Sequence, residues 1–320
     1  MQSASSSTVA TRLVRGLINY SAPSGGCVAT LGTFDGVHLG HKAILQQLRE
    51  LAAHYQAPSV VIVFEPQPQE FFLGEKAPAR LTPMREKVQA LLAAGIDQVV
   101  CLAFNEQLRN FTAEDFVREI LLKRLRVRHL VIGDDFRFGC DREGDFALLT
   151  SLSHTMGFGL SDNQTFEIDG ERVSSTRVRS ALEAGDFAKA EALLGKPYCM
   201  SGKIVYGQQL GRQLGVPTAN VRLRRYRSPL QGVFAVRVTF ADGERFNGVA
   251  NIGIRPSVDG AVKPLLEVHL FDFSRNVYGK HISVEFCLKL RNEQKFASLD
   301  ALQAQLQQDI AAAKHYFAAH

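Results

Sequence analysis

Hydrophobic residues in the first half of the chain follow two alternating patterns. Short runs of consecutive apolar residues, typical of buried parallel strands, lie at 28–31, 59–64, 97–102 and 129–133. Between them, apolar residues recur three or four positions apart at 42–48, 81–95 and 112–125, which predicts helices. For the second helix, Thr82 is the predicted N-cap and Pro83 the first helical residue. Strands that alternate with helices indicate an α/β domain with a doubly wound parallel sheet, where ligands bind beyond the carboxyl ends of the strands.

The pattern changes at Gly185. A short helix is predicted at 187–194, and the apolar runs that follow are short, β-rich and separated by turns. These runs lie at 202–207, 232–238, 246–250, 265–270 and 282–286. Their spacing predicts a small antiparallel barrel, with a final amphipathic helix at about 299–317 packed over it. We therefore expect a flexible tail over 1–12, an α/β domain over 13–184 and a barrel domain over 185–320.

Composition and charge exclude some classes of protein. With 320 residues, 46% of them hydrophobic and 22% charged, the chain has room for two soluble globular domains. Its five scattered cysteines form no C-x-x-C pair, which favours reduced thiols and a cytoplasmic location. No apolar run reaches membrane-spanning length. The net charge of +5 suits nucleic acid and phosphorylated small molecules equally, so it does not decide between them.

A glycine-rich turn with two histidines follows the first apolar run, at 32–41. His38 and His41 stand at the start of a predicted helix, where unpaired N–H groups and the helix dipole favour anions. No cysteine or acidic residue follows at metal-ligand spacing, so we expect a phosphate site rather than a metal site. The other residues assigned to this phosphate site are Gly32, Phe34, Asp35, Gly36 and Gly40.

A second anion site is predicted at 174–179. Ser174, Ser175 and Thr176 precede a helix expected to start at Arg179, so hydroxyls, N–H groups and a guanidinium would converge on a phosphate. The alternative is a plain helix-capping sequence.

A third candidate segment, rich in glycine and polar residues, lies at 207–220 in the barrel domain. Gly207, Gly211 and Gly215 precede Thr218 and Asn220, and no Gly-Lys-Ser/Thr of a Walker loop is present. Because Thr218 and Asn220 are two apart, an extended segment places both side chains on one face, where their oxygens can hold Mg²⁺ beside a nucleotide's phosphates. The alternative is a glycine loop that ends in a turn.

Taken together, these residues resemble the bacterial bifunctional riboflavin kinase/FMN adenylyltransferases, or FAD synthetases, from about Leu13 onward. The similar motifs are G-x-F-D-G-x-H-x-G-H at 32–41, G-x-D-F-x-F-G at 133–139, S-S-T-x-I-R at 174–179 and G-R-x-L-G-x-P-T-A-N at 211–220. The shorter motifs at 251–253, 266–269, 272–273, 278–279 and 290–291 also follow the family's order. Two departures are Val178 in place of Ile, which is trivial, and Gln67 in place of the histidine of F-x-P-H-P, which puts the role of that histidine in doubt.

The resemblance implies two ATP-dependent steps. In the barrel domain, riboflavin would be phosphorylated to FMN, with Glu267 as general base and Mg²⁺ held by Thr218 and Asn220. The residues that would seat the nucleotide there are Gly202, Lys203, Gly207, Gly211, Gly215 and Thr218. Arg291 would lie near the flavin or its phosphate.

In the α/β domain, AMP would pass from ATP to FMN, giving FAD and pyrophosphate. His38, His41 and Arg179 would neutralise phosphate charge, and the three hydroxyls at 174–176 would position the nucleotide. Asp135 and Phe136 are the predicted flavin contacts. The expected partners are therefore small molecules, with no nucleic acid, membrane or obligatory protein partner.

Two other classes of function are weighed against this one. H-x-G-H also resembles the signature of class I synthetases, and Arg222, Arg224, Arg225 and Arg227 form a basic cluster that could bind RNA. However, a synthetase of that class would need a longer chain and a lysine-rich second signature. The other alternative is a flavin-binding module that has lost catalysis in one domain. Gln67 is the only feature of the sequence that favours this alternative.

Overall fold

A computed structural model describes residues 12–320 apart from 134–135, 164, 208–214, 224 and 257–261. The chain forms two compact units. The first contains the residues up to Pro78 and Thr82–Ser174, and the second contains Ala79–Leu81 and Ser175–His320. Helix α8 (Ser175–Ala184) groups with the second unit because it packs against α9 (Phe187–Leu194), which differs from the boundary predicted after residue 184.

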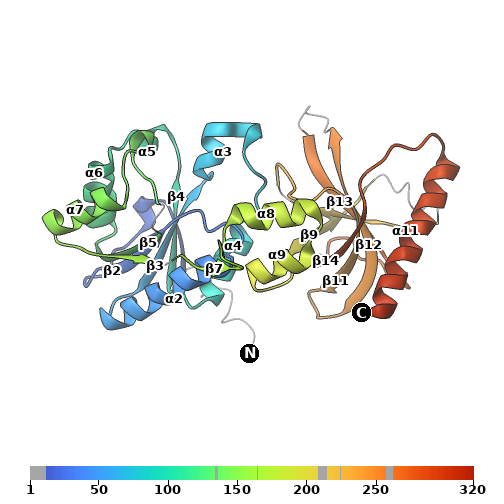
Figure 1. Cartoon of the computed structure of the whole chain (residues 1–320), viewed down its shortest axis with the longest axis horizontal. Helices are drawn as coiled ribbons and strands as arrows, with labels where there is room; N and C mark the ends of the chain where they lie inside the picture. The colour runs from blue at the N-terminus through green and yellow to red at the C-terminus, as the bar shows by residue number, and fades with distance from the viewer. Residues whose placement is uncertain (1–11, 134–135, 164, 208–214, 224, 257–261) are drawn as a thin grey trace. The chain divides into compact units, whose positions relative to one another are not determined.

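The first unit is built on a six-stranded, wholly parallel sheet with the order β1-β4-β3-β2-β5-β6 (Figure 1). Its strands are β1 (Leu13–Arg15), β2 (Cys27–Leu31), β3 (Ser59–Glu65), β4 (Gln98–Ala103), β5 (Val127–Gly133) and β6 (Gly159–Asn163). The four central strands are those predicted from sequence, and the two edge strands were not. β2 lies between β3 and β5, so the chain reverses its direction of winding at β2. Ligands of such sheets bind beyond the carboxyl ends of the strands at this point.

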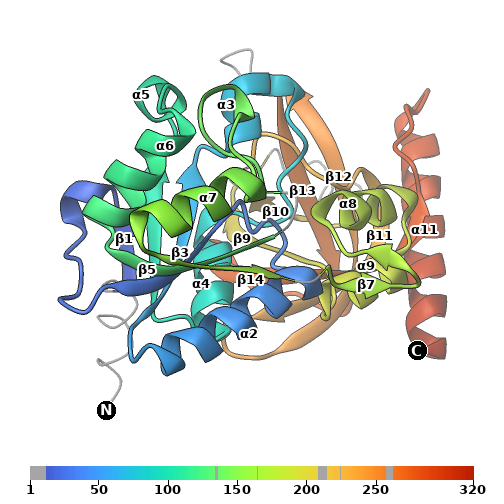
Figure 2. The ribbon, with the colours of Figure 1, turned by 60° about the vertical axis from the view of Figure 1, so that its left-hand side comes forward.

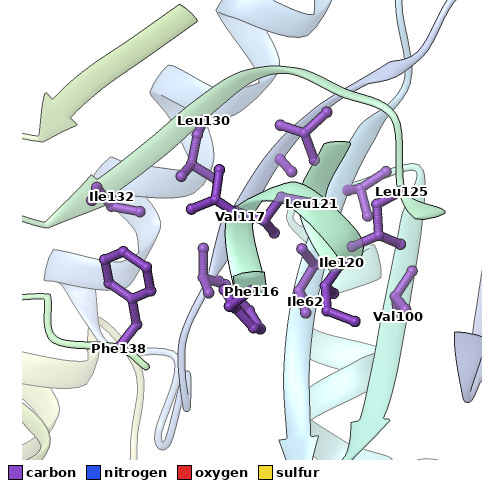
Figure 3. Close-up of a cluster of buried hydrophobic side chains, with 14 of the residues drawn as sticks. Ile62, Val100, Phe116, Val117, Ile120, Leu121, Leu125, Leu130, Ile132 and Phe138 are labelled. Atoms are coloured by element: carbon purple, nitrogen blue, oxygen red, sulfur yellow. The ribbon is translucent and has the colours of Figure 1, made fainter. Parts of the chain in front are cut away.

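Alternate residues of each central strand pack into different cores, which is why the strands read as continuous apolar runs. Ala29 and Ile62 face one core, whereas Val28 and Val61 face the other. In the first core the sheet meets a helical segment over Phe116–Arg124, as Figure 3 shows for Ile62, Val100, Leu130 and Ile132 against Phe116, Val117, Ile120 and Leu121. Each fully buried aliphatic side chain of this kind contributes roughly 1.5–3 kcal/mol to folding.

Helices cover both faces of the sheet, as predicted. The main ones are α2 (Leu39–His54), α4 (Met84–Ala93) and α7 (Phe146–Met156). The helix predicted at 112–125 forms as a short α6 (Ala113–Asp115), capped by the Thr112 hydroxyl, and then the π-helix η3 (Phe116–Arg124). The prediction that Thr82 caps α4 is wrong: Pro83 is the N-cap, no side chain caps the helix, and the Thr82 N–H donates to Asp35 Oδ1.

The second unit is a closed antiparallel barrel with the strand order β10-β13-β12-β11-β14-β9 (Figure 2). Its strands are β9 (Cys199–Val205), β10 (Ala219–Arg222), β11 (Gly232–Phe240), β12 (Arg245–Pro256), β13 (Val262–Leu270) and β14 (His281–Arg291). Leu266 and Val268 fill the interior. The predicted terminal helix, α11 (Leu299–Ala319), lies along the outer wall, where Ala313 and Ile310 pack on Val233 and Val249.

Candidate active sites

The turn after β2 brings two histidines together at the start of α2. His38 is the N-cap, and its Nδ1 accepts a hydrogen bond from the main-chain N–H of His41 at 3.3 Å. This bond requires Nδ1 to be unprotonated, so the ring proton of His38 is assigned to Nε2. The two rings stack with centroids 3.6 Å apart and an interplanar angle of 15°. The H-x-G-H spacing therefore makes one compact imidazole pair.

The imidazole of His41 is neutral near pH 7. Its ring Nδ1 is buried, and burial lowers the pKa of His41 well below its usual range. His38, Lys87 and Arg172 lower this pKa further, in that order. A neutral His41 ring can donate one hydrogen bond but carries no positive charge.

Positive charge near His41 comes from Lys87 and Arg172, which the sequence analysis missed. Lys87 lies on α4 and is fully buried, at 0% exposure. Arg172 ends the short strand β8 (Glu171–Arg172). A lysine on the apolar face of an amphipathic helix, beside Val88 and Leu91, is the signal that could have identified Lys87.

The glycine-rich turn itself is held from two sides. Asp35 is buried, and its Oδ1 accepts a hydrogen bond from the Thr82 N–H at 3.0 Å. Gly36 has a φ of 86°, the left-handed region that favours glycine. At Gly40, a Cβ atom would lie 3.1 Å from the Val173 carbonyl oxygen, so this glycine lets the residue before Ser174 approach α2. Gly32 and the buried Phe34 complete the turn.

Gln67 lies at the start of α3 (Pro68–Leu73), just after the end of β3. Its N–H donates to Glu70 Oε2 at 2.9 Å, and its side chain is only 6% exposed. The side-chain Nε2 has no hydrogen-bond partner among the residues that the structure describes. Gln67 thus places a buried amide at the position where the motif F-x-P-H-P has its histidine.

The hydroxyl and arginine motif at 174–179 starts its helix earlier than predicted, since α8 begins at Ser175 instead of Arg179. Ser174 ends the first unit, while Ser175, Thr176 and Arg179 belong to the second. Arg179 Nε donates to the Ala79 carbonyl oxygen at 2.7 Å.

Of the two predicted flavin contacts in the α/β domain, Phe136 is partly buried and stacks on Phe138, with ring centroids 5.6 Å apart. Asp135 lies outside the described residues. Phe136 follows the carboxyl end of β5, and the histidines follow the carboxyl end of the neighbouring parallel strand β2.

On the barrel, three polar side chains form a row across adjacent strands. Glu267 of β13 is directly opposite Asn220 of β10 on one side and Asn251 of β12 on the other. Residues paired in this way project from the same face of a sheet. Because Leu266 and Val268 point into the barrel, the row lies on the outer wall. Asn220 and Glu267 are site residues predicted from the sequence, whereas Asn251 was predicted only as part of a short motif without a role.

Glycine allows Asn220 to take its place in this row. A Cβ atom on Gly207 would overlap the Asn220 side-chain amide, which is only 5% exposed. Thr218 directly precedes β10, and the preceding Pro217 carbonyl oxygen is 2.9 Å from Nδ1 of His269. Among the other predicted nucleotide contacts, Gly215 has a φ of 74° and Gly211 lies outside the described residues.

Gly202 and Lys203 lie on β9, next to β10. A Cβ atom on Gly202 would be 2.6 Å from the Arg222 carbonyl oxygen, so close strand packing explains this glycine without any ligand. Lys203 is exposed.

Arg291 forms a bidentate ion pair with Asp309 of α11. Its Nε lies 2.9 Å from Asp309 Oδ1, and its Nη2 lies 2.8 Å from Asp309 Oδ2. Asp309 is almost fully buried. Arg291 pairs with Val233, which in turn pairs with Asn251, so the polar row leads around the barrel to this ion pair. The predicted flavin contact is thus an arginine that the terminal helix holds in place.

Comparisons with known proteins match both units. A family model described as FAD synthetase matches residues 21–177, and one described as riboflavin kinase matches residues 194–317. The bifunctional riboflavin kinase/FMN adenylyltransferase of Pseudomonas fluorescens is 54% identical over 303 residues, which cover 95% of this chain and 97% of the relative. This chain belongs to that family.

Further relatives agree over nearly the whole length. The bifunctional riboflavin kinase/FMN adenylyltransferase of Escherichia coli K12 is 50% identical, covering 96% of this chain and 98% of the relative. That of Haemophilus influenzae is 47% identical, covering 96% and 99%. A crystal structure described as a macrolide-efflux protein from Streptococcus pneumoniae has a TM-score of 0.77 at 28% identity, covering 93% of this chain and 97% of that one. In the described part of this chain, no helix is long and apolar enough to span a bilayer.

Membership in the riboflavin kinase/FMN adenylyltransferase family confirms the resemblance predicted from sequence. The parallel sheet followed by a closed antiparallel barrel and a terminal helix confirms the predicted fold class. The roles of individual residues remain predictions.

Proposed function

We propose that this chain carries out both reactions of its family, with one reaction on each unit. Riboflavin would be phosphorylated to FMN on the barrel, and AMP would be transferred from ATP to FMN on the α/β unit. The division is supported by the two family models, which match separate parts of the chain. The observation that carries the kinase assignment is the placement of Glu267 between Asn220 and Asn251 on the outer wall of the barrel.

In the kinase step, the Glu267 carboxylate accepts the proton of the ribityl 5′-hydroxyl as that oxygen attacks the γ-phosphorus of ATP. The bond from the γ-phosphorus to its bridging oxygen breaks, and ADP leaves. The strand register places the carboxylate between the amides of Asn220 and Asn251 on one face of the sheet. Arg291, fixed by Asp309, contributes a rigid cation near the flavin or its phosphate.

The donor atoms around Asn220 fit Mg²⁺. The Thr218 hydroxyl and the Asn220 amide supply oxygen ligands of the kind that this ion prefers. No group of three or more His, Cys, Asp or Glu side chains suited to a metal occurs among the described residues, which favours binding shared with a nucleotide's phosphates. When bound, Mg²⁺ would offset charge on the triphosphate, and Thr218 and Asn220 would hold it.

In the adenylyl step, a phosphate oxygen of FMN attacks the α-phosphorus of ATP, and pyrophosphate leaves as the bond to the β-phosphate breaks. No covalent enzyme intermediate is required. His38 and His41 donate hydrogen bonds to the phosphates, while Lys87 and Arg172 supply the positive charge beside them. The Ser174 hydroxyl would position the nucleotide there. The roles predicted for Ser175, Thr176 and Arg179 stay predictions, since these residues belong to the second unit.

The test is incubation of the purified protein with riboflavin, ATP and Mg²⁺, followed by chromatographic separation of the flavins. FAD is the expected product. FMN alone would contradict the adenylyl assignment and point to Gln67, and no conversion would contradict both assignments. In that case salt-sensitive RNA binding should be measured, since the basic residues at 222–227 favour it. We place the reactions in the cytoplasm because all five cysteines are free thiols.

A further inference from the structure

A second carboxylate lies beside the polar row on the outer wall of the barrel. Glu293 follows the end of β14, and its Oε1 occupies the space into which a side chain on Gly253 of β12 would project. A Cβ atom on Gly253 would overlap this oxygen and would lie 3.5 Å from Nδ2 of Asn251. Gly253 thus leaves the space in which the Glu293 carboxylate approaches the Asn251 amide, and all three residues belong to the second unit.

No ion pair among the described residues explains the position of Glu293. Its side chain is exposed, and Nε2 of Gln231 donates a hydrogen bond to its Oε2 at 3.2 Å. Arg291, two residues before it, is paired with Asp309 instead. A neutral amide therefore orients the carboxylate, while its charge is not offset by a cation of the described chain and its Oε1 is open to a donor from a ligand.

Asn251 has an unsatisfied hydrogen-bonding group next to this carboxylate. Its Oδ1 is buried and has no hydrogen-bond partner in the part of the chain that the structure describes. A buried acceptor without a donor costs free energy, and asparagine is disfavoured in strands. Stability therefore gives little reason for asparagine at this position, whereas a ligand that brings a donor would satisfy it.

A carboxylate beside an amide suits a ligand with hydroxyl groups on neighbouring carbons. The two oxygens of Glu293 accept hydrogen bonds, and the amide of Asn251 both accepts and donates them, so adjacent hydroxyls can bond to both side chains. The ribityl chain of riboflavin has such secondary hydroxyls next to the 5′-hydroxyl that is phosphorylated. The negative charge of Glu293 would repel a nucleotide's phosphates, so this part of the wall suits the neutral chain.

We propose that Glu293 and Asn251 bind the secondary hydroxyls of the ribityl chain during riboflavin phosphorylation. The strand order supports this role, because β13 lies between β10 and β12. Glu267 therefore stands between Asn220, on the side proposed for Mg²⁺ and the nucleotide, and Asn251, on the side proposed for the ribityl chain. A chain held at Asn251 and Glu293 has its 5′-hydroxyl directed to the base between the two sides. This inference rests on the proposed assignment of the kinase reaction to the barrel.

The test uses the full chain with Glu293→Gln, Asn251→Ala and Gly253→Ala. The last variant displaces the Glu293 carboxylate without changing it, since only the end of a flexible side chain must move. For each variant, kcat and KM for riboflavin phosphorylation are measured, together with the inhibition constant of lumiflavin, which has a methyl group in place of the ribityl chain. We expect KM for riboflavin to rise about tenfold in each variant, because hydrogen bonds to the hydroxyls are weakened or lost. The inhibition constant of lumiflavin should not change.

The matched control is Glu191→Gln, which changes an exposed glutamate on α9 of the same unit and should leave KM for riboflavin unchanged. Wild-type KM in Glu293→Gln and Gly253→Ala would overturn the proposal. So would a parallel rise in KM for riboflavin and in the inhibition constant of lumiflavin, since that result means a general disturbance of the flavin site. A wild-type protein that does not phosphorylate riboflavin would instead overturn the proposed function.

Discussion

Glu267 faces Asn220 across the β10–β13 pair, and the two side chains share the outer wall of the barrel. The strand pairing places the amide and the carboxylate at directly opposite positions on the same face of the sheet. A general base must first lie within hydrogen-bond reach of the proton that it accepts, and only then does its pKa affect the rate.

Glu267→Gln removes the base but keeps the shape of the side chain. We expect FMN formation from riboflavin to fall about 10²- to 10⁴-fold, the usual contribution of a general base. FAD formation from supplied FMN should stay at the wild-type rate. Both rates can be followed by chromatography of the flavins, and a variant that still phosphorylates riboflavin normally would refute the role of Glu267.

His41→Ala should have the opposite pattern. The stacked imidazole pair loses a hydrogen-bond donor to the phosphates, so FAD formation from FMN should fall about 10²- to 10³-fold. Riboflavin phosphorylation serves as the internal control and should not change. Equal loss of both reactions would mean that the substitution disturbs folding.

Gly207→Ala tests the support of Asn220. The added methyl group would overlap the Asn220 amide and displace it from the row beside Glu267. We expect kcat of the kinase step to fall by about 10², the cost of a misplacement on the order of 1 Å. Gly243→Ala is a matched control in a turn of the same barrel, where nothing lies within 4 Å of an added Cβ. Its φ of 92° favours glycine, so this control variant loses stability but should keep kinase turnover. Normal kinase turnover in Gly207→Ala would contradict the proposed support.

The buried state of His41 predicts the sign of a pH effect on stability. The pKa of His41 is lowered in the folded protein, so the unfolded chain binds more protons below about pH 6.5. The free energy of unfolding should therefore decrease as the pH falls below about 6.5. In His41→Gln this contribution disappears, and the difference in slope is at most about 1.4 kcal/mol per pH unit. Urea unfolding between pH 8 and 5 measures it, and equal slopes in the two proteins would refute the assignment.

The ion pair between Arg291 and Asp309 links the barrel to its terminal helix. Arg291→Met leaves a buried carboxylate without its cation, which should cost about 3–5 kcal/mol of stability. The double variant Arg291→Met/Asp309→Leu should recover much of that loss, because no charge remains buried. Urea unfolding of the single and double variants tests the coupling, and purely additive losses would contradict it.

The central strands could be predicted from sequence because their consecutive residues point to opposite faces of the sheet and are all apolar. Val61 and Ile62, for example, lie in different cores. The sequence pattern missed β1 and β6, since edge strands are less buried and β6 contains Asp162 and Asn163. Strand β10 was not predicted either. Of its four residues, only Val221 is a fully buried apolar residue, so the strand leaves almost no hydrophobic pattern in the sequence. Local patterns therefore located the strands that are buried on both sides.

The candidate sites were predictable only in part. The histidine pair lies within one local motif and could be found from sequence. Lys87 lies on α4, more distant in the chain, and a single lysine in a helix usually indicates a solvent-exposed face. Likewise, the place of Asn251 beside Glu267 depends on strand register, which is set by pairing across the whole barrel. Such relationships require the tertiary structure.

The polar row stands on strands whose alternate residues fill the barrel. Along β13, Leu266 and Val268 point inward on either side of Glu267. Neighbouring positions therefore alternate between the packed interior and the outer wall. Substitutions at inward positions change the stability of the barrel, whereas those at outward positions change the surface that we propose binds the substrates. Over evolutionary time the two properties can therefore drift apart: a lineage adapting to heat or cold can exchange interior residues while its flavin chemistry stays the same.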